Sequence, residues 1–525
     1  MDKPKIKDIT IEYLYLAICA FLIMMIATRS SFLYPYNNWD DANSYFSMGK
    51  SLFNGKVLYR DVFDQKGMYL YFLYGLAYLM SHTTFAGVFV IEVLCAFVDI
   101  WGFSGILEFF TSKKIAVVIS PLMLAILVSS RCFYWGGAAE EICLPFLIVS
   151  VYLGIHLFEK DIDSEKAVCQ NLAIVGLLAG FVANIKFNVL GLYIAYAALI
   201  GIYLLAKKKI YLCFKIALCF LGGMLVTFIP WIIYFGIHGA LYDWYWGYVY
   251  VNVFAYAKFG DETVTFLLKT KNLIKIFYTI LREDMCCFLM LVAGVLGIQF
   301  IKIIKPITRV AILFLAAGTF LGIYIGGRTL PYYAIPVALF GIFGLALIVY
   351  LCNKITNGIL SEGYGVNKVV KLVPEGCVAG IAAIVVMAIC LIVTLNCSNS
   401  VYFMKQDKDE FFLTRFKNII EADGIDNPTL LNTGCLDAGL YTVCDIVPNV
   451  RWFQTQTLDM EDGPGNPYYE QYSYVKNQLT DYVLVRDGAL GDISDYYELV
   501  DSVDYSFPYR NMTLTYNYSL YRKNN

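Results

Sequence analysis

The sequence predicts an all-α polytopic membrane protein with about 11 transmembrane helices, followed by a small C-terminal α/β domain outside the membrane. Hydrophobic residues make up 59% of the 525 residues and charged residues 16%, against roughly 25% charged residues in soluble globular proteins. The charge is also uneven, because residues 401–525 contain 10 Lys and Arg against 19 Asp and Glu. This composition excludes a disordered chain and a protein with a large basic surface for nucleic acid, so no nucleic-acid partner is expected.

Apolar runs that approach the thickness of a membrane recur through the first 400 residues. A transmembrane helix needs about 20 apolar residues, because each residue rises about 1.5 Å and the hydrocarbon core is about 30 Å thick. Eleven runs fit or approach this length, at 10–28, 88–110, 115–130, 142–158, 171–185, 188–206, 210–236, 284–301, 309–326, 333–352 and 376–396. The Tyr-rich segment 67–80 is shorter, so we expect a juxtamembrane helix there.

The positions of the lysines predict the orientation of the chain. Cytoplasmic loops carry an excess of Lys and Arg, and such residues fall in alternate loops, for example at Lys113, Lys114 and Lys207–Lys209. The N-terminus is therefore expected in the cytoplasm, with residues 1–400 forming a transmembrane module and residues 401–525 an extracytoplasmic domain. The external loops are expected at about 30–87, 131–141, 238–260 and 326–333.

The C-terminal domain mixes helical and strand patterns. A helix is expected over 408–422, and strands over 429–432, 482–486 and 513–522, the last with the alternation of an edge strand. Cys435 and Cys444 lie nine residues apart in this domain, so a disulfide and two free thiols are both open. We expect the domain to support acceptor binding, because it lies on the same side as the external loops and is rich in aromatic residues.

Two pairs of adjacent carboxylates lie in the external loops. One member of the pair Asp40 and Asp41 can accept a proton while the other holds an acceptor or a cation. The alternative is that Asp40 caps a helix, and the two roles are compatible. The second pair, Glu140 and Glu141, could equally be acids in the first turn of a helix, where they favour the helix dipole.

Three basic residues from separate segments are expected near the external leaflet, namely Lys66, Lys186 and Arg328. A lone Lys or Arg that reaches the lipid headgroups explains each one by itself. Because all three are expected on the same side of the membrane, together they favour a binding site for a lipid phosphate. No metal site is predicted, because the chain has only three histidines, widely separated, and no Cys and His spacing typical of zinc.

These residues, in this order, resemble the polytopic GT-C glycosyltransferases, in the branch that includes protein O-mannosyltransferases and lipid A aminoarabinose transferases. The motifs that carry the resemblance are Asp40 and Asp41 with Tyr45, the run from Gly55 through Tyr59 to Lys66, Gly136 and Gly137 with Glu140 and Glu141, residues 180–186, and Gly326 to Arg328 with Pro331 and Tyr333. The resemblance covers most of the chain. It implies a GT-C type of fold.

The resemblance also implies a polyprenyl-monophosphate sugar donor and an inverting transfer on the external face of the membrane. The acceptor would be a glycan, a lipid or a protein. By position, Asp40 takes the role of the base, and the second acid pair would orient the acceptor or the base. The three basic residues would bind the donor phosphate, and the substrate groove would be lined by Tyr45, Tyr59, Tyr332 and Tyr333.

No cofactor is expected to be required, although some members of the family use a divalent cation. Tyr332 stands where the family often has His, which weakens a metal-dependent variant. Two other classes of function stay open from the sequence, a transporter of lipid-linked glycans and an inactive membrane scaffold. A transporter would place ionisable residues within the spans, and Glu92, Asp99 and Glu108 could form a polar seam along one face of the second span.

Overall fold

The computed structural model describes residues 6–255, 266–361, 375–458, 460–461, 463–509 and 512–524. The chain divides into two compact units. The first comprises Met1–Thr28, Glu92–Phe228 and Glu262–Val401, and the second comprises Arg29–Ile91, Ile229–Asp261 and Tyr402–Asn525. The predicted division into residues 1–400 and 401–525 stays a prediction.

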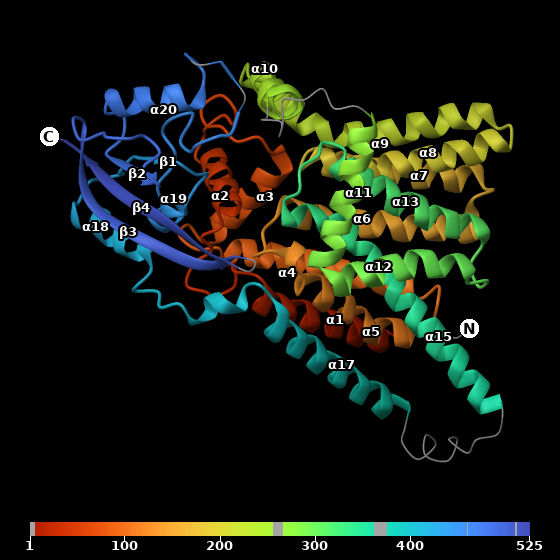
Figure 1. Ribbon diagram of the computed structural model, residues 1–525. Helices are drawn as coiled ribbons and strands as arrows, with labels where there is room; N and C mark the ends of the chain where they lie inside the picture. The colour runs from red at the N-terminus through yellow and green to blue at the C-terminus, as the bar shows by residue number, and fades with distance from the viewer. Residues whose placement is uncertain are drawn as a thin grey trace. The chain divides into compact units, whose positions relative to one another are not determined.

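The first unit consists mainly of apolar helices, and Figure 1 traces them along the chain. Its α-helices are α1 (Ile6–Ala27), α4 (Ala86–Leu107), α5 (Lys113–Val128), α6 (Ala139–His156), α7 (Glu165–Ala183), α8 (Gly191–Ala206), α9 (Ile210–Ile237), α11 (Phe266–Glu283), α12 (Met285–Gly297), α13 (Pro306–Tyr324), α14 (Ile335–Ala338), α15 (Ile342–Ser361) and α17 (Glu375–Cys397). Short 3₁₀ or π segments lie at η1 (Arg131–Phe133), η2 (Leu157–Asp161), η3 (Phe187–Leu190), η5 (Ile298–Phe300), η6 (Pro331–Ala334) and η7 (Leu339–Gly341). The division between the units falls inside α4 and α9.

Nine helices within the described residues are long and apolar enough to cross a membrane. They correspond to nine of the eleven predicted spans, so the predicted class of a polytopic helical membrane protein is confirmed. The other two predicted spans form α5, with 16 residues, and α12, with 13 residues. At about 1.5 Å per residue they are shorter than the hydrocarbon core. Helix α11 was not predicted, because its lysines interrupt the apolar pattern.

Glycines allow two of these helices to approach closely. A Cβ added at Gly176 of α7 would overlap the backbone of α9, and one added at Gly223 of α9 would overlap the backbone of α7. Small residues at such contacts let helix backbones pack tightly where water provides no driving force. Neither position can therefore hold a side chain larger than that of glycine without displacing the neighbouring helix.

The second unit combines two short helices from the first predicted external loop with a small mixed sheet. Its elements are α2 (Asp40–Phe53), α3 (Met68–Met80), α10 (Leu241–Trp244), the π-helix η4 (Tyr245–Ala255), η8 (Val401–Lys405), which begins at the unit boundary, α18 (Phe412–Ala422), α19 (Leu440–Val443), α20 (Pro467–Lys476), β1 (Leu430–Thr433), β2 (Tyr482–Arg486), β3 (Tyr497–Tyr509) and β4 (Met512–Lys523). The sheet order is β1-β2-β4-β3, with β1 and β2 parallel and the other pairs antiparallel. A helix is confirmed at the segment 67–80, as α3, and its juxtamembrane position stays a prediction.

Three expectations for this unit are corrected. The strand expected at 513–522 exists as β4, but it lies between β2 and β3 and is not an edge. The edge strands are β1 and β3, and β3 was missed because Glu498, Asp501 and Asp504 break its apolar pattern. Asp40 does not cap α2, because the N-cap position is occupied by Trp39 and Asp40 is already helical. The aromatic loop expected at 238–260 is helical up to Ala255, and its last residues lie outside the described ones.

Candidate active site

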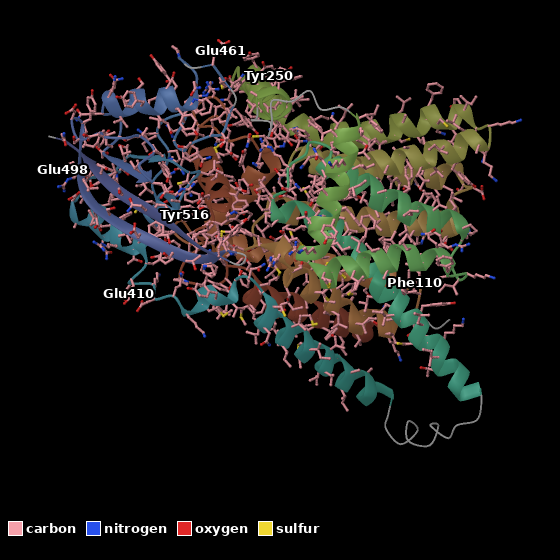
Figure 2. All side chains as sticks on the ribbon, in the orientation of Figure 1. Phe110, Tyr250, Glu410, Glu461, Glu498 and Tyr516 are labelled. Carbon is pink, nitrogen blue, oxygen red and sulfur yellow. The ribbon has the colours of Figure 1, made fainter. Side chains whose placement is uncertain are left out.

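Asp40, the expected base, lies at the first position of α2 and pairs with an arginine from the C-terminal segment. Arg486 Nη1 lies 2.9 Å from Asp40 Oδ2. Arg486 is the last residue of β2, its Nη2 donates to the Gly434 carbonyl at 3.1 Å, and its guanidinium carbon lies 4.5 Å from the centre of the Tyr516 ring on β4. Tyr516 is labelled on the sheet in Figure 2. The Asp40 side chain is 28% exposed. Burial raises the pKa of Asp40, and the Arg486 charge opposes that rise.

One face of α2 continues this polar contact with the C-terminal segment. Residues spaced three or four apart share a helix face, and Asn43, Ser44, Ser47 and Lys50 follow Asp40 at that spacing. They contact residues of the C-terminal segment through four pairs, namely Asn43 with Thr442, Ser44 with Gln454, Ser47 with Asp437, and Lys50 with Asp445. Asp40 therefore begins a helix that is fixed along its length by polar contacts with residues distant in the sequence.

Lys50 is the deepest charge in this polar face. Its side chain is fully buried, its ammonium lies 3.0 Å from Asp445 Oδ1, and it donates to the Tyr441 carbonyl at 2.9 Å. Burial lowers the pKa of Lys50, and the Asp445 carboxylate opposes that effect. Ser47 lies one turn before Lys50 on α2, and its hydroxyl donates to Asp437 Oδ2 at 2.6 Å. Burial raises the pKa of Asp437 to about 6.

The opposite side of α2 carries Asp41 and Tyr45, which are four residues apart. Both are buried. The Lys66 ammonium lies 5.7 Å from the centre of the Tyr45 ring, within the range of a cation–π interaction. The structure therefore brings Lys66 to the face of α2 that also holds Asp41, and places Asp40 on the face toward Arg486.

The turn that carries Lys66 is held by buried tyrosines. Tyr59 has a φ of 68°, is fully buried, and donates its hydroxyl to the Lys66 carbonyl at 2.6 Å. Tyr71 accepts from the Lys66 backbone N–H at 2.7 Å and donates its hydroxyl to Asp64 Oδ2 at 2.7 Å. Tyr59 therefore shapes the loop that presents Lys66, which differs from its expected place in a substrate groove.

The first unit holds a second cluster of the predicted residues. Lys186 Nζ forms an ion pair with Glu140 Oε1, and it lies 4.1 Å from the centre of the Tyr333 ring and 5.4 Å from that of Tyr332. The ion pair is nearly buried, with side-chain exposures of 10% for Lys186 and 1% for Glu140. Glu140 of α6 and the two tyrosines of η6 thus surround the ammonium of Lys186, which lies in the turn between α7 and η3.

Glu141 and Arg328 have different surroundings within this unit. Glu141 Oε2 accepts from the Gly137 N–H at 2.7 Å, so it closes the turn that precedes α6. Gly136 has a φ of 85°, and a Cβ there would overlap the Thr28 and Glu92 side chains. Both acids lie in the first turn of α6, as the alternative interpretation expected. Arg328 is half-buried and follows Gly327, whose φ is 82°.

The polar seam expected along the second span is wrong in one member. Glu92 and Asp99 are buried in α4, and Thr28 donates to Glu92 at 2.8 Å. Glu108 is exposed. The reason is geometric, because seven residues return nearly to the same face of a helix whereas nine residues reach the opposite face.

Several features of the site had no clear signal in the sequence. Arg486 was visible only as the last residue of a predicted strand, and its partner Asp40 lies 446 positions away.

Cys435 and Cys444 are both free thiols. Among the residues that the structure describes, no group of three or more His, Cys, Asp or Glu side chains is arranged to hold a metal ion.

Comparison with known proteins identifies the fold. No protein-family model and no curated protein match the sequence. Among solved structures, ArnT from Cupriavidus metallidurans bound to undecaprenyl phosphate is 10% identical, covers 98% of both chains and has a TM-score of 0.59. Its apo form is 11% identical, covers 97% of both chains and has a TM-score of 0.60. The oligosaccharyltransferase of Archaeoglobus fulgidus tethered with an acceptor peptide is 13% identical, with a TM-score of 0.44 over 96% of this chain and 74% of that one.

The chain therefore has the fold of ArnT, a GT-C glycosyltransferase. The GT-C fold expected from the sequence resemblance is confirmed.

Proposed function

We propose that this protein is an inverting glycosyltransferase that moves a sugar from a polyprenyl-monophosphate donor to an acceptor hydroxyl. The observation that carries the proposal is the carboxylate of Asp40, fixed by Arg486 at the start of α2 in a chain with the ArnT fold. The ArnT structure holds undecaprenyl phosphate, which supports a lipid-linked donor. The acceptor would be a glycan, a lipid or a protein, and the reaction would take place on the external face of the membrane, with the N-terminus in the cytoplasm.

Asp40 would act as the general base. The acceptor hydroxyl must lose its proton while its oxygen attacks the anomeric carbon, and a carboxylate within reach can take that proton. Arg486 binds Oδ2, so Oδ1 is the oxygen assigned to proton transfer. The raised pKa of Asp40 makes its ionised form a stronger base than an ordinary aspartate.

The basic residues would stabilise the leaving group. As the bond from the anomeric carbon to the phosphate oxygen breaks, the lipid phosphate gains negative charge, which nearby cations stabilise. Lys66, Lys186 and Arg328 are assigned to this role. Glu140 and its neighbour Glu141 are assigned to positioning, because Glu140 binds the Lys186 ammonium and Glu141 closes the turn at Gly137.

The experiment is sugar release from a panel of polyprenyl-phosphate sugars by the purified protein in lipid, with and without EDTA. Asp40→Asn should abolish transfer while abundance and thermal stability stay near those of the parent. The matched control is Asp492→Asn, an exposed acid of the same unit in the loop before β3, which should retain activity. An active Asp40→Asn variant would remove the assignment of the base.

Transport of a lipid-linked glycan is the second candidate, because Glu92 and Asp99 are buried within α4 and intramembrane acids often line pathways. The two candidates differ in product. Reconstituted vesicles loaded with a fluorescent lipid-linked sugar would show movement between leaflets without a new glycosidic bond if transport is the function.

A further inference from the structure

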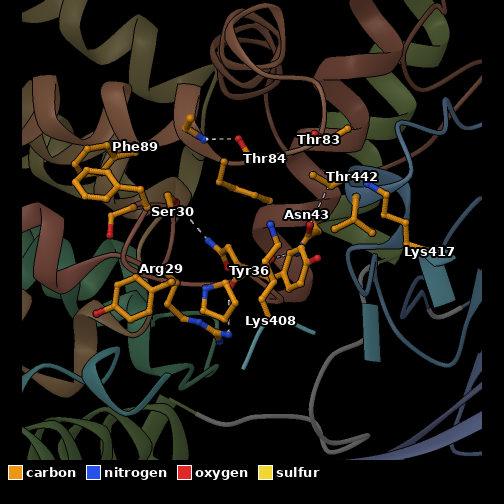
Figure 3. Close-up of a pocket in the computed structure, with 18 residues that line it drawn as sticks. Arg29, Ser30, Tyr36, Asn43, Thr83, Thr84, Phe89, Lys408, Lys417 and Thr442 are labelled. Atoms are coloured by element: carbon orange, nitrogen blue, oxygen red, sulfur yellow. Dashed lines mark hydrogen bonds between the residues drawn. The ribbon is translucent and has the colours of Figure 1, made fainter. Parts of the chain in front are cut away.

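A cavity of about 320 Å³ lies in the second unit. Neither Asp40 nor Lys66 lines it. Its walls come from three stretches of sequence, residues 29–37, residues 83–89 and the segment from Lys408 to Val443, with Asn43 of α2 between them. Figure 3 shows side chains from these stretches around the pocket. A volume of this size accommodates a small polar group.

The charge of the lining is one-sided. The three charged residues that line the cavity are Arg29, Lys408 and Lys417, and none of the described lining residues is Asp or Glu. The hydroxyl groups of Ser30 and Thr84 also line the cavity. Three cations without a carboxylate in the lining favour an anion that accepts charge-assisted hydrogen bonds, and a phosphate does so.

Arg29 is held in place by the surrounding polypeptide. It is 1% exposed, its guanidinium stacks 3.7 Å from the centre of the Phe403 ring, and its Nη2 donates to the Tyr36 carbonyl and to Asn38 Oδ1. Lys408 lies 5.5 Å from the centre of the Tyr36 ring. Lys417 lies 3.5 Å from Glu421 on the same helix, and the Glu421 side chain is 60% exposed, so this pair neutralises little of the Lys417 charge.

The cavity also lies near membrane-spanning sequence. Arg29 follows the end of α1 by two residues, and Ala86, another lining residue, is the first residue of α4. Both helices are long and apolar enough to cross a membrane, so Arg29 and Ala86 are expected near the level of the headgroups by connectivity. Phe32 is 70% exposed and packs edge to face with Phe89 at 6.1 Å, which provides an apolar surface beside the charges.

We propose that this cavity binds the phosphate of an anionic lipid headgroup, with the acyl part against Phe32. The basic lining supplies the charge that selects an anion, and the aromatic pair supplies the contact that distinguishes a lipid from a soluble phosphate. This inference does not rest on the proposed glycosyl transfer, because it concerns binding alone.

The test is native mass spectrometry of the full-length protein in detergent, titrated separately with dioctanoyl phosphatidylglycerol, dioctanoyl phosphatidylcholine and glycerol 3-phosphate. The parent should prefer phosphatidylglycerol to the other two. The double variant Lys408→Glu with Lys417→Glu should weaken its binding by about tenfold or more, since each cation near a membrane surface contributes about 1 kcal/mol. Both side chains are at least partly exposed, so the variant should fold, which thermal unfolding checks.

The matched control is Lys476→Glu with Lys523→Glu, which makes the same change of net charge in the same unit away from the cavity. It should bind phosphatidylglycerol as the parent does. Equal weakening in both double variants, or weakening in neither, would overturn the site. Glycerol 3-phosphate bound as tightly as the lipid, and lost in the pocket variant, would keep the phosphate site but overturn the lipid as its source.

Discussion

Removing the Arg486 charge should raise the pH at which the protein becomes active. The Arg486 and Asp40 side chains are only 17% and 28% exposed, and their charged atoms lie 2.9 Å apart. An Arg beside an Asp typically lowers the pKa of the carboxyl by about 1–3 units, so Arg486→Met should raise the pKa of Asp40 further above its ordinary value. The base works only when it is ionised. The acidic limb of the kcat/KM profile should therefore move up by about 1–3 pH units, with about a tenfold loss of rate per unit on that limb.

The assay is sugar release from the donor between pH 5 and pH 9. Arg522→Met is the control, because Arg522 lies on β4 and pairs with Asp423 and Glu498. It should leave the acidic limb in place. An unchanged limb in a folded Arg486→Met variant, or a limb that moves to lower pH, would refute the assignment of Asp40 as the base that Arg486 tunes.

Three further predictions concern the packing of α2. Lys50→Met should leave the thermal stability near that of the parent. Asp445→Asn should lower the free energy of unfolding by about 3 kcal/mol, because it leaves a buried ammonium without its carboxylate. A lower melting temperature for Lys50→Met than for Asp445→Asn would contradict this. The pKa of Asp437 is raised from 3.8 to about 6, so the folded state favours its protonated form. Its contribution to stability should be fully present below about pH 4 and be lost as the pH rises through 6, by up to about 3 kcal/mol. Asp437→Asn should remove that pH dependence of the melting temperature, and identical profiles would show that Asp437 is not responsible. Gly49→Ala should lower the free energy of unfolding by about 1–3 kcal/mol, because its Cβ would overlap the backbone of α3. The control is Gly236→Ala on α9, where nothing lies near the added Cβ and no such loss is expected. Equal melting temperatures for the two variants would contradict the close packing of α2 and α3.

Local patterns predicted much of the fold. Apolar runs of about 20 residues predicted the membrane helices, and strand patterns at 429–432 and 482–486 predicted β1 and β2. The strand β3 and the helix α11 were missed because their charged side chains interrupt the pattern that identifies an element. The order of the strands was not accessible either, since it depends on pairing between segments and not on the sequence of any one of them.

The residues of the candidate site likewise fall into those with a local signal in the sequence and those without one. Residue types in the external loops identified Lys186 and Glu140, which the structure joins in an ion pair. Arg486 could not be identified, because a single arginine at the end of a strand carries no local sign of its partner. Lys50 was not singled out from the sequence, and its burial follows only from the packing of the C-terminal segment onto α2. Partners of buried charges are set by tertiary contacts, which one sequence does not reveal.

The contacts along α2 change how the role of the C-terminal segment can be tested. Deletion of residues 401–525 would remove Arg486 from Asp40 and expose the buried Lys50 at the same time. Loss of activity after such a deletion would follow from the collapse of α2, whether or not the segment binds an acceptor. The expected role in acceptor binding can therefore be examined only with substitutions that leave this polar face intact. Exposed Tyr468 and Tyr469 of α20 meet that condition, since neither contributes to the α2 contacts, and a change of KM for the acceptor without a change in the pH profile would separate binding from positioning of the base.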